Sequence, residues 1–454
     1  MKPVPMLRGD SAASAGLAVA VWLAYFNALT GVFQFDDYNV IVNNPAVHSL
    51  AAWRESLPGI RALLKLSYAL NWTLDAGPFG FHLFNVLVHA INTVLVYRLL
   101  RALRDRRAGA DWAPIVGAML FALHPVQTEA VTYVSGRSVS LMGLFYLCSA
   151  MTWLRADRTA NPPAWRALSA ALFGAALLVK ETAVTLPLAL LLLDAAGTRH
   201  RFTAAQMLRR QRWHWLMLTG GLLVMAASPT YRHLLDVSIS TRGVIDNLLT
   251  QANAVCYLSG QLLLPWRMNI DPDLPMMTAL SPSLALQILA VIAIVVVALR
   301  NLRRRPWLAF AVLWFSLHLL PTNSLLPRLD VANDRQLYLA SIGAFFAVGI
   351  GVQEWSLRAN RRWLVGAATA LLLLGLGVAT LQRNRIYGSA VAFWEDAAMK
   401  SPGNPRVANN LGYAYQQAGR LAQARLAYER AIELDPDYWK ARINLDALEP
   451  VQQR

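Results

Sequence analysis

The sequence is poor in charged residues and in cysteine. Only 15% of its 454 residues are charged, against about 25% in soluble domains, whereas 56% are hydrophobic. One aqueous core cannot bury so large an apolar share, so the composition excludes an ordinary soluble domain. The two cysteines, Cys148 and Cys256, lie in apolar segments. We expect them to fill the interior rather than to form a disulfide or bind a metal.

Acidic residues are scarcer than basic ones: 26 Asp and Glu stand against 42 Lys and Arg, a net charge of +16. In a soluble protein this balance would suggest nucleic-acid binding. Here the arginines cluster between apolar segments, which is the pattern of a multi-pass membrane protein. Residues 283–299 (SLALQILAVIAIVVVAL) carry no charge over about one bilayer thickness. We therefore predict repeated membrane crossings and no nucleic-acid partner.

The N-terminus resembles a signal peptide, because Lys2 and Arg8 precede an apolar run at 12–29. That run is longer than the roughly 7–15 apolar residues of a cleavable signal, and no small-residue cleavage site precedes Phe33. The segment is predicted to stay as an anchor.

Arginine distribution predicts the topology. With a cytoplasmic N-terminus, the arginines at 98–107, 155–158, 199–212, 300–305 and 358–362 all fall on the cytoplasmic side. The stretch 248–266 is then re-entrant or interfacial, because a crossing there would place the arginines at 300–305 and 358–362 on the non-cytoplasmic side. The Ala, Arg and Leu content is typical of a GC-rich bacterium, so we expect the bacterial inner (plasma) membrane. The eleven predicted crossings are 12–31, 81–97, 112–123, 139–154, 164–179, 182–193, 213–228, 283–299, 306–320, 338–353 and 363–381.

The apolar stretch 164–193 is long for one crossing and short for two, and Lys180-Glu181 interrupts it. We predict two short helices that meet at a polar junction, which is tolerated in a membrane where it lines a watery cavity. The predicted fold is all-α: a polytopic membrane helix bundle over residues 1–381, with an external loop at 32–80, followed by a small helical unit at 386–454.

The C-terminal unit matches a tetratricopeptide repeat. A half-repeat at 390–402 precedes the complete one, and a lone first helix at 438–448 follows it. Such repeats bury their apolar faces by stacking, so a unit this short is expected to lean on the membrane domain. It either binds a peptide or protein partner or has a purely structural role. The residues in register with the 34-residue pattern are Leu411, Gly412, Tyr415, Gly419, Ala424, Tyr428, Ala431 and Pro436.

The polar residues that are candidates for catalysis or binding lie in the predicted external connections 32–80, 124–138, 180–181, 229–282 and 321–337. Carboxylates there could deprotonate a hydroxyl, and cations could hold a phosphate leaving group. The combination favours glycosyl transfer from a lipid phosphate. The candidates are Asp36, Asp37, His124, Glu129, Arg137, Lys180, Glu181, Asp334, Arg335 and Tyr338.

Structural alternatives exist for several of these residues. Asp36 and Asp37 could be solvated loop residues, and Lys180 could pair with Glu181 or across helices. Arg137 and Arg335 could bind lipid headgroups. His124 could be a helix cap, because it lacks partners at metal-ligand spacing.

Nearly the whole chain resembles the transmembrane and tetratricopeptide repeat containing O-mannosyltransferases and their bacterial relatives, which are membrane glycosyltransferases of the GT-C class. The resemblance implies a polyprenyl-phosphate donor that carries mannose or another hexose, and a hydroxyl on a protein or glycan acceptor. It implies inverting transfer on the periplasmic side, where the repeat unit also lies. The matching motifs are FDDYNVIVNNPAV (35–47), FGFHLFNVLVHAIN (79–92), HPVQTEAVTYVSGRSVSL (124–141), KETAVTLPLALLLLD (180–194) and DRQLYLASIG (334–343).

The resemblance also implies residue roles. Asp36 or Asp37 is the general base, and either could hold a divalent cation (Mg or Mn) as in relatives that need one. The donor phosphate is assigned to Arg137, Lys180 and Arg335, and the remaining pocket residues are His124, Glu129, Glu181 and Tyr338. The repeat array is shorter than in the animal proteins, and residues 334–338 read DRQLY where ERYLY is usual.

Two other functions compete with transfer. A membrane-anchored scaffold would use the tetratricopeptide unit to recruit partners without catalysis. A transporter would line a path with polar residues, but these gather toward one face and the sequence has no matched inverted halves.

Overall fold

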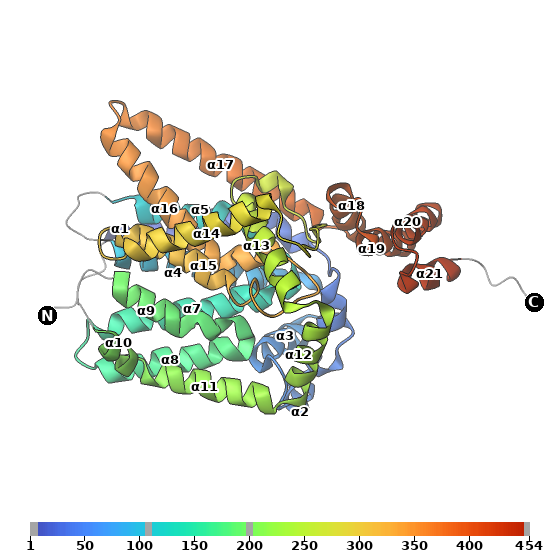
Figure 1. Ribbon diagram of the computed structural model, residues 1–454, viewed down its shortest axis with the longest axis horizontal. Helices are drawn as coiled ribbons and strands as arrows, with labels where there is room; N and C mark the ends of the chain where they lie inside the picture. Colours follow the sequence, from blue (N-terminus) through green and yellow to red (C-terminus); the bar gives the residue numbers. More distant parts are fainter. Residues whose placement is uncertain (1–7, 105–110, 197–202, 449–454) are drawn as a thin grey trace, which may run out of the picture.

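The structure is a computed structural model that describes residues 8–104, 111–196 and 203–448. These residues form helices and no β-strand, so the predicted all-α class is confirmed. Most of the long helices run side by side along the long axis of the molecule. The first described helix, α1 (Arg8–Tyr25), begins at one end, and the small C-terminal unit extends beyond the other (Figure 1).

Seven helical stretches in the described residues are long and apolar enough to cross a membrane: Asp10–Thr30, Pro78–Leu103, Val134–Ala156, Pro162–Val179, Pro282–Arg300, Asp334–Arg358 and Arg362–Ile386. They contain helices α1 (Arg8–Tyr25), α4 (Pro78–Leu103), α7 (Arg137–Ala156), α8 (Pro162–Val179), α14 (Pro282–Arg300), α16 (Leu337–Arg358) and α17 (Arg362–Ile386).

Four shorter helices account for the other predicted crossings. Helices α5 (Ala113–Leu123) and α9 (Leu186–Ala196) have 11 residues each. Helices α15 (Pro306–Leu319) and α11 (Arg212–Ala227) have 14 and 16. All eleven predicted segments are therefore helices. The multi-pass architecture is confirmed, while the number of crossings stays a prediction.

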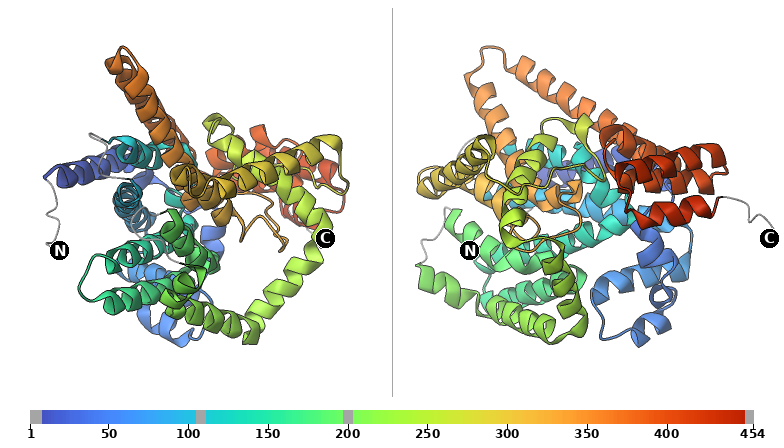
Figure 2. Two further views of the ribbon diagram at one scale, coloured as in Figure 1. Left: turned by 60° about the vertical axis from the view of Figure 1, so that its left-hand side comes forward. Right: turned by 45° about the vertical axis from the view of Figure 1, so that its right-hand side comes forward.

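Burial separates an inner group of helices from an outer one. More than half of the apolar window is buried in α7 and α16, but only 11% of it in α14 and 17% in α17. Leu286 and Leu289 of α14 are largely exposed. An apolar surface of this extent is what a bilayer would cover. The hairpin of α16 and α17 projects from the bundle in two views (Figures 1 and 2).

Two glycines allow α16 to approach its neighbours closely. A Cβ at Gly343 would collide with the carbonyl of Ala311 in α15, and one at Gly349 with the carbonyl of Ala113 in α5. Small residues at such crossings are typical of packed membrane helices. The short 3-10 helix η8 (Asp334–Gln336) leads directly into α16, so this packing fixes where Arg335 lies.

The polar junction between α8 and α9 is confirmed. Helix α8 ends at Val179, Lys180 is extended, and η6 (Glu181–Thr185) leads into α9. Helix α13 (Val244–Gln261) covers most of the stretch 248–266, and its interfacial placement stays a prediction. The other connecting elements are η1 (Phe26–Thr30), η2 (Tyr38–Val42), η3 (Pro45–Val47), α2 (Leu50–Glu55), α3 (Ala62–Leu74), η4 (Pro125–Gln127), α6 (Thr128–Val131), η5 (Val134–Gly136), α10 (Ala204–Arg210), α12 (Pro229–Thr241) and η7 (Pro265–Arg267).

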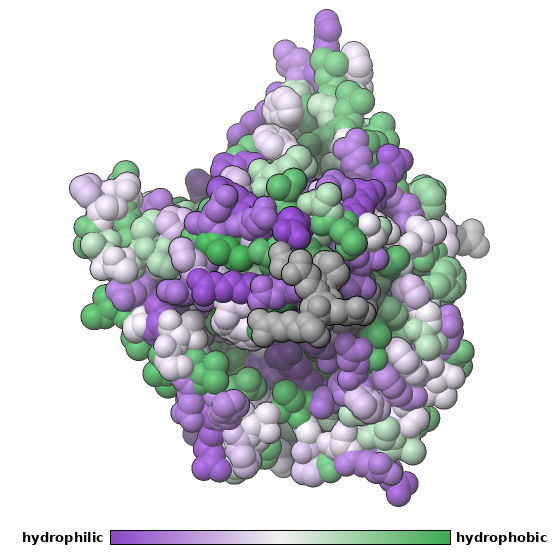
Figure 3. All heavy atoms as spheres, turned by 90° about the vertical axis from the view of Figure 1, so that its right-hand side faces the viewer, coloured by the Kyte–Doolittle hydropathy of each residue, from purple (hydrophilic) through white to green (hydrophobic). Residues whose placement is uncertain are grey.

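The C-terminal unit consists of α18 (Ala390–Lys400), α19 (Pro405–Gln417), α20 (Leu421–Leu434) and α21 (Trp439–Asp446). Gly412 of α19 lies against the ring of Tyr428 in α20, where a Cβ would clash. Apolar residues of α18 and α19 pack on Tyr133 and Ile270, so the expectation that the unit leans on the membrane domain is confirmed. Hydrophilic side chains gather across the middle of this end of the molecule (Figure 3).

Candidate active site

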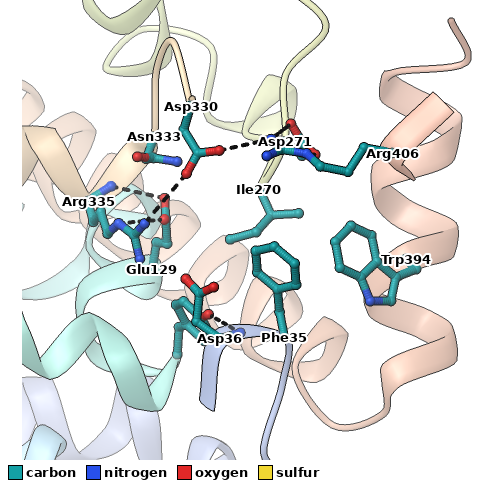
Figure 4. Close-up of a pocket in the computed structure, with 11 residues that line it drawn as sticks. Phe35, Asp36, Glu129, Ile270, Asp271, Asp330, Asn333, Arg335, Trp394 and Arg406 are labelled. Atoms are coloured by element: carbon teal, nitrogen blue, oxygen red, sulfur yellow. Dashed lines mark hydrogen bonds and ion pairs between the residues drawn. The ribbon is translucent and has the colours of Figure 1, made fainter. Parts of the chain in front are cut away.

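A small cavity opens where the C-terminal unit meets the membrane domain (Figure 4). Its walls come from the first external connection (residues 32–80), the α6 segment, the loop after α13, the loop after α15, and helices α18 and α19. We call it the junction cavity. It is lined by Phe35, Asp36, Glu129, Tyr133, Ile270, Asp271, Asp330, Asn333, Arg335, Trp394 and Arg406.

Asp36 lies at the wall of this cavity on a strained turn. The preceding Phe35 has φ 41°, a left-handed conformation that is unfavourable for a bulky residue. Such strain is often found at functional sites. The backbone N–H of Asp36 donates to the hydroxyl of Tyr133 at 2.9 Å. The Asp36 carboxylate points into the cavity, toward the side on which Glu129 and Arg335 lie (Figure 4).

Asp37 faces the other way and is buried. One carboxylate oxygen accepts from the backbone N–H of Gln34 at 2.9 Å; the other accepts from the N–H of Ser135 at 2.7 Å and from its hydroxyl. Burial raises the pKa of Asp37 to about 7, although these hydrogen bonds oppose the rise. Asp37 therefore holds the first external connection to the segment before α7. Of the two adjacent aspartates, Asp36 faces the cavity and Asp37 is buried.

Glu129 and Arg335 face each other across the cavity floor. The Arg335 backbone N–H donates to Oε2 of Glu129 at 3.0 Å, and its Nε lies 3.3 Å from Oε1. A second carboxylate, that of Asp330, lies 4.0 Å from Arg335. Burial raises the pKa of Glu129, although the Arg335 guanidinium acts to lower it.

A second small cavity is lined by basic side chains, and we call it the cationic cavity. Lys180, Arg328 and Arg335 all line it. Among the described residues, neither Lys180 nor Arg328 forms an ion pair with a carboxylate. Burial lowers the pKa of Lys180 well below its ordinary value, and the guanidinium groups of Arg335 and Arg61 lower it further. The other lining residues are Val139, Met142, Thr182, His318, Thr322, Gln336 and Leu339.

Glu181 is held beside this cavity by Arg61. Arg61 donates to both carboxylate oxygens of Glu181 at 2.9–3.2 Å, and the hydroxyl of Tyr231 donates to it at 2.9 Å. Burial alone would raise the pKa of Glu181, but Arg61 outweighs it and lowers the pKa overall. Arg61, like Phe35, has a positive φ, 54°. Glu181 thus pairs with Arg61, which leaves Lys180 available to a ligand.

Arg137 is fully buried and lines neither cavity. It donates to Oδ1 of Asn85 at 2.7 Å, to the carbonyl of Ser67 at 3.1 Å and to that of Phe81 at 3.0 Å. Three aromatic rings surround its guanidinium at 4.4–5.2 Å. This placement joins α3, α4 and α7, and it does not bring Arg137 to the other predicted phosphate ligands.

His124 and Tyr338 also lie outside both cavities. The His124 ring accepts from the backbone N–H of Val126 at 3.1 Å, so it caps η4, which is the structural alternative that the sequence left open. Tyr338 is buried, and its hydroxyl lies 3.0 Å from the amide of Asn92 and 2.9 Å from the ring of His89.

The lining residues that sequence reasoning did not single out include Arg328, Asp330, Asp271, Trp394 and Arg406. The first three lie in predicted external connections, so their charge in such a loop was an available signal. Trp394 and Arg406 lie in the repeat unit. The sequence predicts that this unit leans on the membrane domain, but not which of its residues make the contact. Within the described residues, no group of three or more His, Cys, Asp or Glu side chains could hold a metal ion.

Two family models match the chain. Residues 57–230 match dolichyl-phosphate-mannose-protein mannosyltransferase, and residues 405–438 match the tetratricopeptide repeat. A solved structure, the Archaeoglobus fulgidus oligosaccharyltransferase, superposes with a TM-score of 0.45 at 12% identity, covering 84% of this chain and 55% of that one.

Relatives align along most of the chain. Protein O-mannosyl-transferase Tmtc3 of Drosophila melanogaster is 26% identical over 94% of this chain and 56% of its own length. TMTC3 of Homo sapiens is 25% identical over 94% and 52%. Tmtc2 of Drosophila melanogaster reaches 35% identity, but over 38% and 20%. The chain spans about half the length of the relatives that it matches along most of its own. Over nearly its whole length, this multi-pass membrane chain resembles the protein O-mannosyl-transferases that carry tetratricopeptide repeats.

Proposed function

We propose that this protein transfers mannose or another hexose from a polyprenyl-phosphate donor to a hydroxyl of a protein or glycan acceptor. The reaction would take place on the periplasmic side of a bacterial inner membrane. One observation carries the proposal: Arg335 lines both the junction cavity and the cationic cavity. A group in that position can hold the donor phosphate while the acceptor approaches from the other side.

The cationic cavity suits the donor phosphate. No described carboxylate forms an ion pair with Lys180 or Arg328. Arg328 and Arg335 can donate to phosphate oxygens as cations, and a bound phosphate would favour the protonated form of Lys180, whose pKa burial lowers. A phosphate dianion or monoanion would offset their mutual repulsion. In this proposal the prenyl chain of the donor stays in the lipid beside the apolar outer helices. The protein then has to bind only the charged phosphate.

Asp36 suits the role of general base in the junction cavity. Its carboxylate takes the proton from the acceptor hydroxyl as the hydroxyl oxygen bonds to the anomeric carbon. The bond between that carbon and the phosphate oxygen breaks, and the electron pair leaves with polyprenyl phosphate, whose charge the three cations stabilise. Attack opposite the leaving group inverts the anomeric configuration.

The other predicted residues take supporting roles in this proposal. Asp37 holds the turn that carries Asp36, and Glu129 holds Arg335. Arg61 and Glu181 fix the junction that carries Lys180. Arg137, His124 and Tyr338 brace the helices around the site.

The test is transfer by the full-length protein from synthetic polyprenyl-phosphate mannose, measured beside Asp36→Asn. We expect this variant to insert and to bind donor as the native protein does, with turnover lost by at least about a hundredfold, as for removal of a general base. Asp75→Asn is the matched control, because Asp75 is exposed on the same connection. Normal turnover by Asp36→Asn would exclude Asp36 as the base.

A further inference from the structure

The repeat unit contributes side chains to the junction cavity. Trp394 of α18 and Arg406 of α19 both line it, from a part of the chain that follows the last membrane helix. Trp394 meets Phe35 edge to face, with ring centroids 5.3 Å apart, and Phe35 directly precedes Asp36. Figure 4 shows these two rings and Ile270 on one side of the cavity, with Arg335 and Glu129 on the other.

Ion pairs fix the unit in this position. Arg406 donates to both oxygens of Asp271 at 2.7 and 2.6 Å and to Asp330 at 2.9 Å, and Asp330 in turn lies 4.0 Å from Arg335. At the other side of α18, Arg383 of α17 holds Asp396 at 2.6 Å.

Backbone and hydroxyl contacts complete the attachment. Ser401 donates to the carbonyl of Asp271 at 2.9 Å and accepts from Asn269 at 2.7 Å. The carbonyl of Tyr387, just before α18, accepts from the backbone N–H of Val32 at 3.4 Å and from the side chain of Gln34 at 3.3 Å. The start of the unit is thus tied to the same connection that carries Asp36.

The lining of the junction cavity is negative, although the whole chain is strongly positive. Its four carboxylates exceed its two guanidinium groups by two, and with Glu129 neutral they still exceed them by one. Charge of one sign at a binding surface favours a partner of the opposite sign. Beside the carboxylates, the ring of Phe35 is 36% exposed and can pack on a peptide backbone. The ring of Trp394 is only 5% exposed and supports Phe35 edge to face.

We infer that the repeat unit is a wall of the acceptor site. The carboxylates there select a polypeptide whose acceptor hydroxyl is flanked by cationic residues, and Trp394 positions the Phe35 ring on which that polypeptide packs. This inference rests on the proposed function for the identity of the site. It assigns the unit a place in acceptor recognition, in contrast to both a separate peptide-binding module and a purely structural appendage.

The test is binding of a dye-labelled pentapeptide to the full-length protein, followed by fluorescence anisotropy. The peptide has a central threonine between alanines and a lysine at each end; a second peptide has aspartates in place of the lysines. The variants are Trp394→Leu and, as the matched control, Trp439→Leu, because Trp439 is exposed on α21 away from the cavity.

The lysine peptide is expected to bind the native protein about tenfold more tightly than the aspartate peptide. Trp394→Leu should weaken lysine-peptide binding about fivefold or more, and Trp439→Leu should leave it within about twofold. Donor binding should be unchanged in both variants. Equal binding of the two peptides, or unchanged binding by Trp394→Leu, would overturn the inference.

If Trp394→Leu does not fold, it will also lose donor binding. The variant Trp394→Phe then tests whether Trp394 contributes to peptide binding. That variant keeps a ring against Phe35 but shortens the wall, so weakened peptide binding supports the inference and native binding contradicts it. Peptide binding requires no transfer. A native protein that binds the lysine peptide through Trp394 yet transfers no sugar would contradict the proposed function and support the inference.

Discussion

Arg335 holds Glu129 through both its backbone and its side chain. The amide N–H lies 3.0 Å from one carboxylate oxygen and Nε lies 3.3 Å from the other, with Glu129 buried and only 13% of the Arg335 side chain exposed. Arg335, which lines both cavities, is therefore held in place by Glu129, which lines only the junction cavity.

Replacing Arg335 should affect folding and donor binding separately. Arg335→Gln leaves the buried Glu129 charge uncompensated, which costs about 3–5 kcal/mol of stability. We expect a lower melting temperature in detergent and loss of donor binding. The double variant Arg335→Gln/Glu129→Gln should regain most of the melting temperature but not donor binding. Restored donor binding in the double variant would remove Arg335 from the phosphate site.

Asp37 should make stability depend on pH. Its ordinary pKa is 3.8 and its folded pKa is about 7, so between these values the folded state keeps a proton that the unfolded state has lost. Stability should therefore fall as pH rises from about 4 to 7 and then level off. Asp37→Asn cannot ionise and should lack this part of the slope. Melting temperatures across the range check the expectation; an identical slope in the variant would show that Asp37 does not titrate in this range.

Arg137 should matter for stability and not for the donor. Arg137→Met keeps much of the side-chain volume but leaves acceptors on Asn85, Ser67 and Phe81 without their donor, at a cost of about 3 kcal/mol or more. Folded variant protein should bind polyprenyl-phosphate mannose within about twofold of the native protein. A selective loss of donor affinity, with the melting temperature unchanged, would restore the phosphate role predicted from sequence.

Arg406 should hold the repeat unit to the membrane domain. Its side chain is 32% exposed and Asp271 only 10%, so Arg406→Gln is expected to cost about 1–3 kcal/mol, less than a fully buried pair. Limited proteolysis should cut the variant faster near residues 387–404.

Arg430→Gln is the matched control for Arg406→Gln. Its pair with Glu433 is exposed on both sides and should contribute less than about 0.5 kcal/mol. Equal proteolysis of the two variants would mean that Asp271 and Asp330 do not anchor the unit.

Local pattern was sufficient for the helices. Every predicted membrane segment is helical, the break at Lys180 lies where two charges interrupt an apolar run, and the repeat helices begin and end close to the predicted residues. These features depend on hydrophobicity and on spacing within a few turns, both of which can be read directly from consecutive residues.

The site was only partly available from the sequence. Asp36, Glu129, Lys180 and Arg335 line the two cavities as candidates in polar connections. The sequence could not separate Asp36 from Asp37, because neighbours on a turn point in different directions and only the position of Ser135 decides which one is buried.

The sequence by itself determined a bundle of apolar helices with its polar residues gathered in the connections, because burial in lipid and helical periodicity act locally. Tertiary structure alone decided that Arg137 is enclosed by three rings, that Arg335 serves two cavities, and that Trp394 and Arg406 complete a wall beside Asp36. Those contacts join residues tens to hundreds of positions apart, and they depend on how whole helices pack rather than on any pattern within one of them.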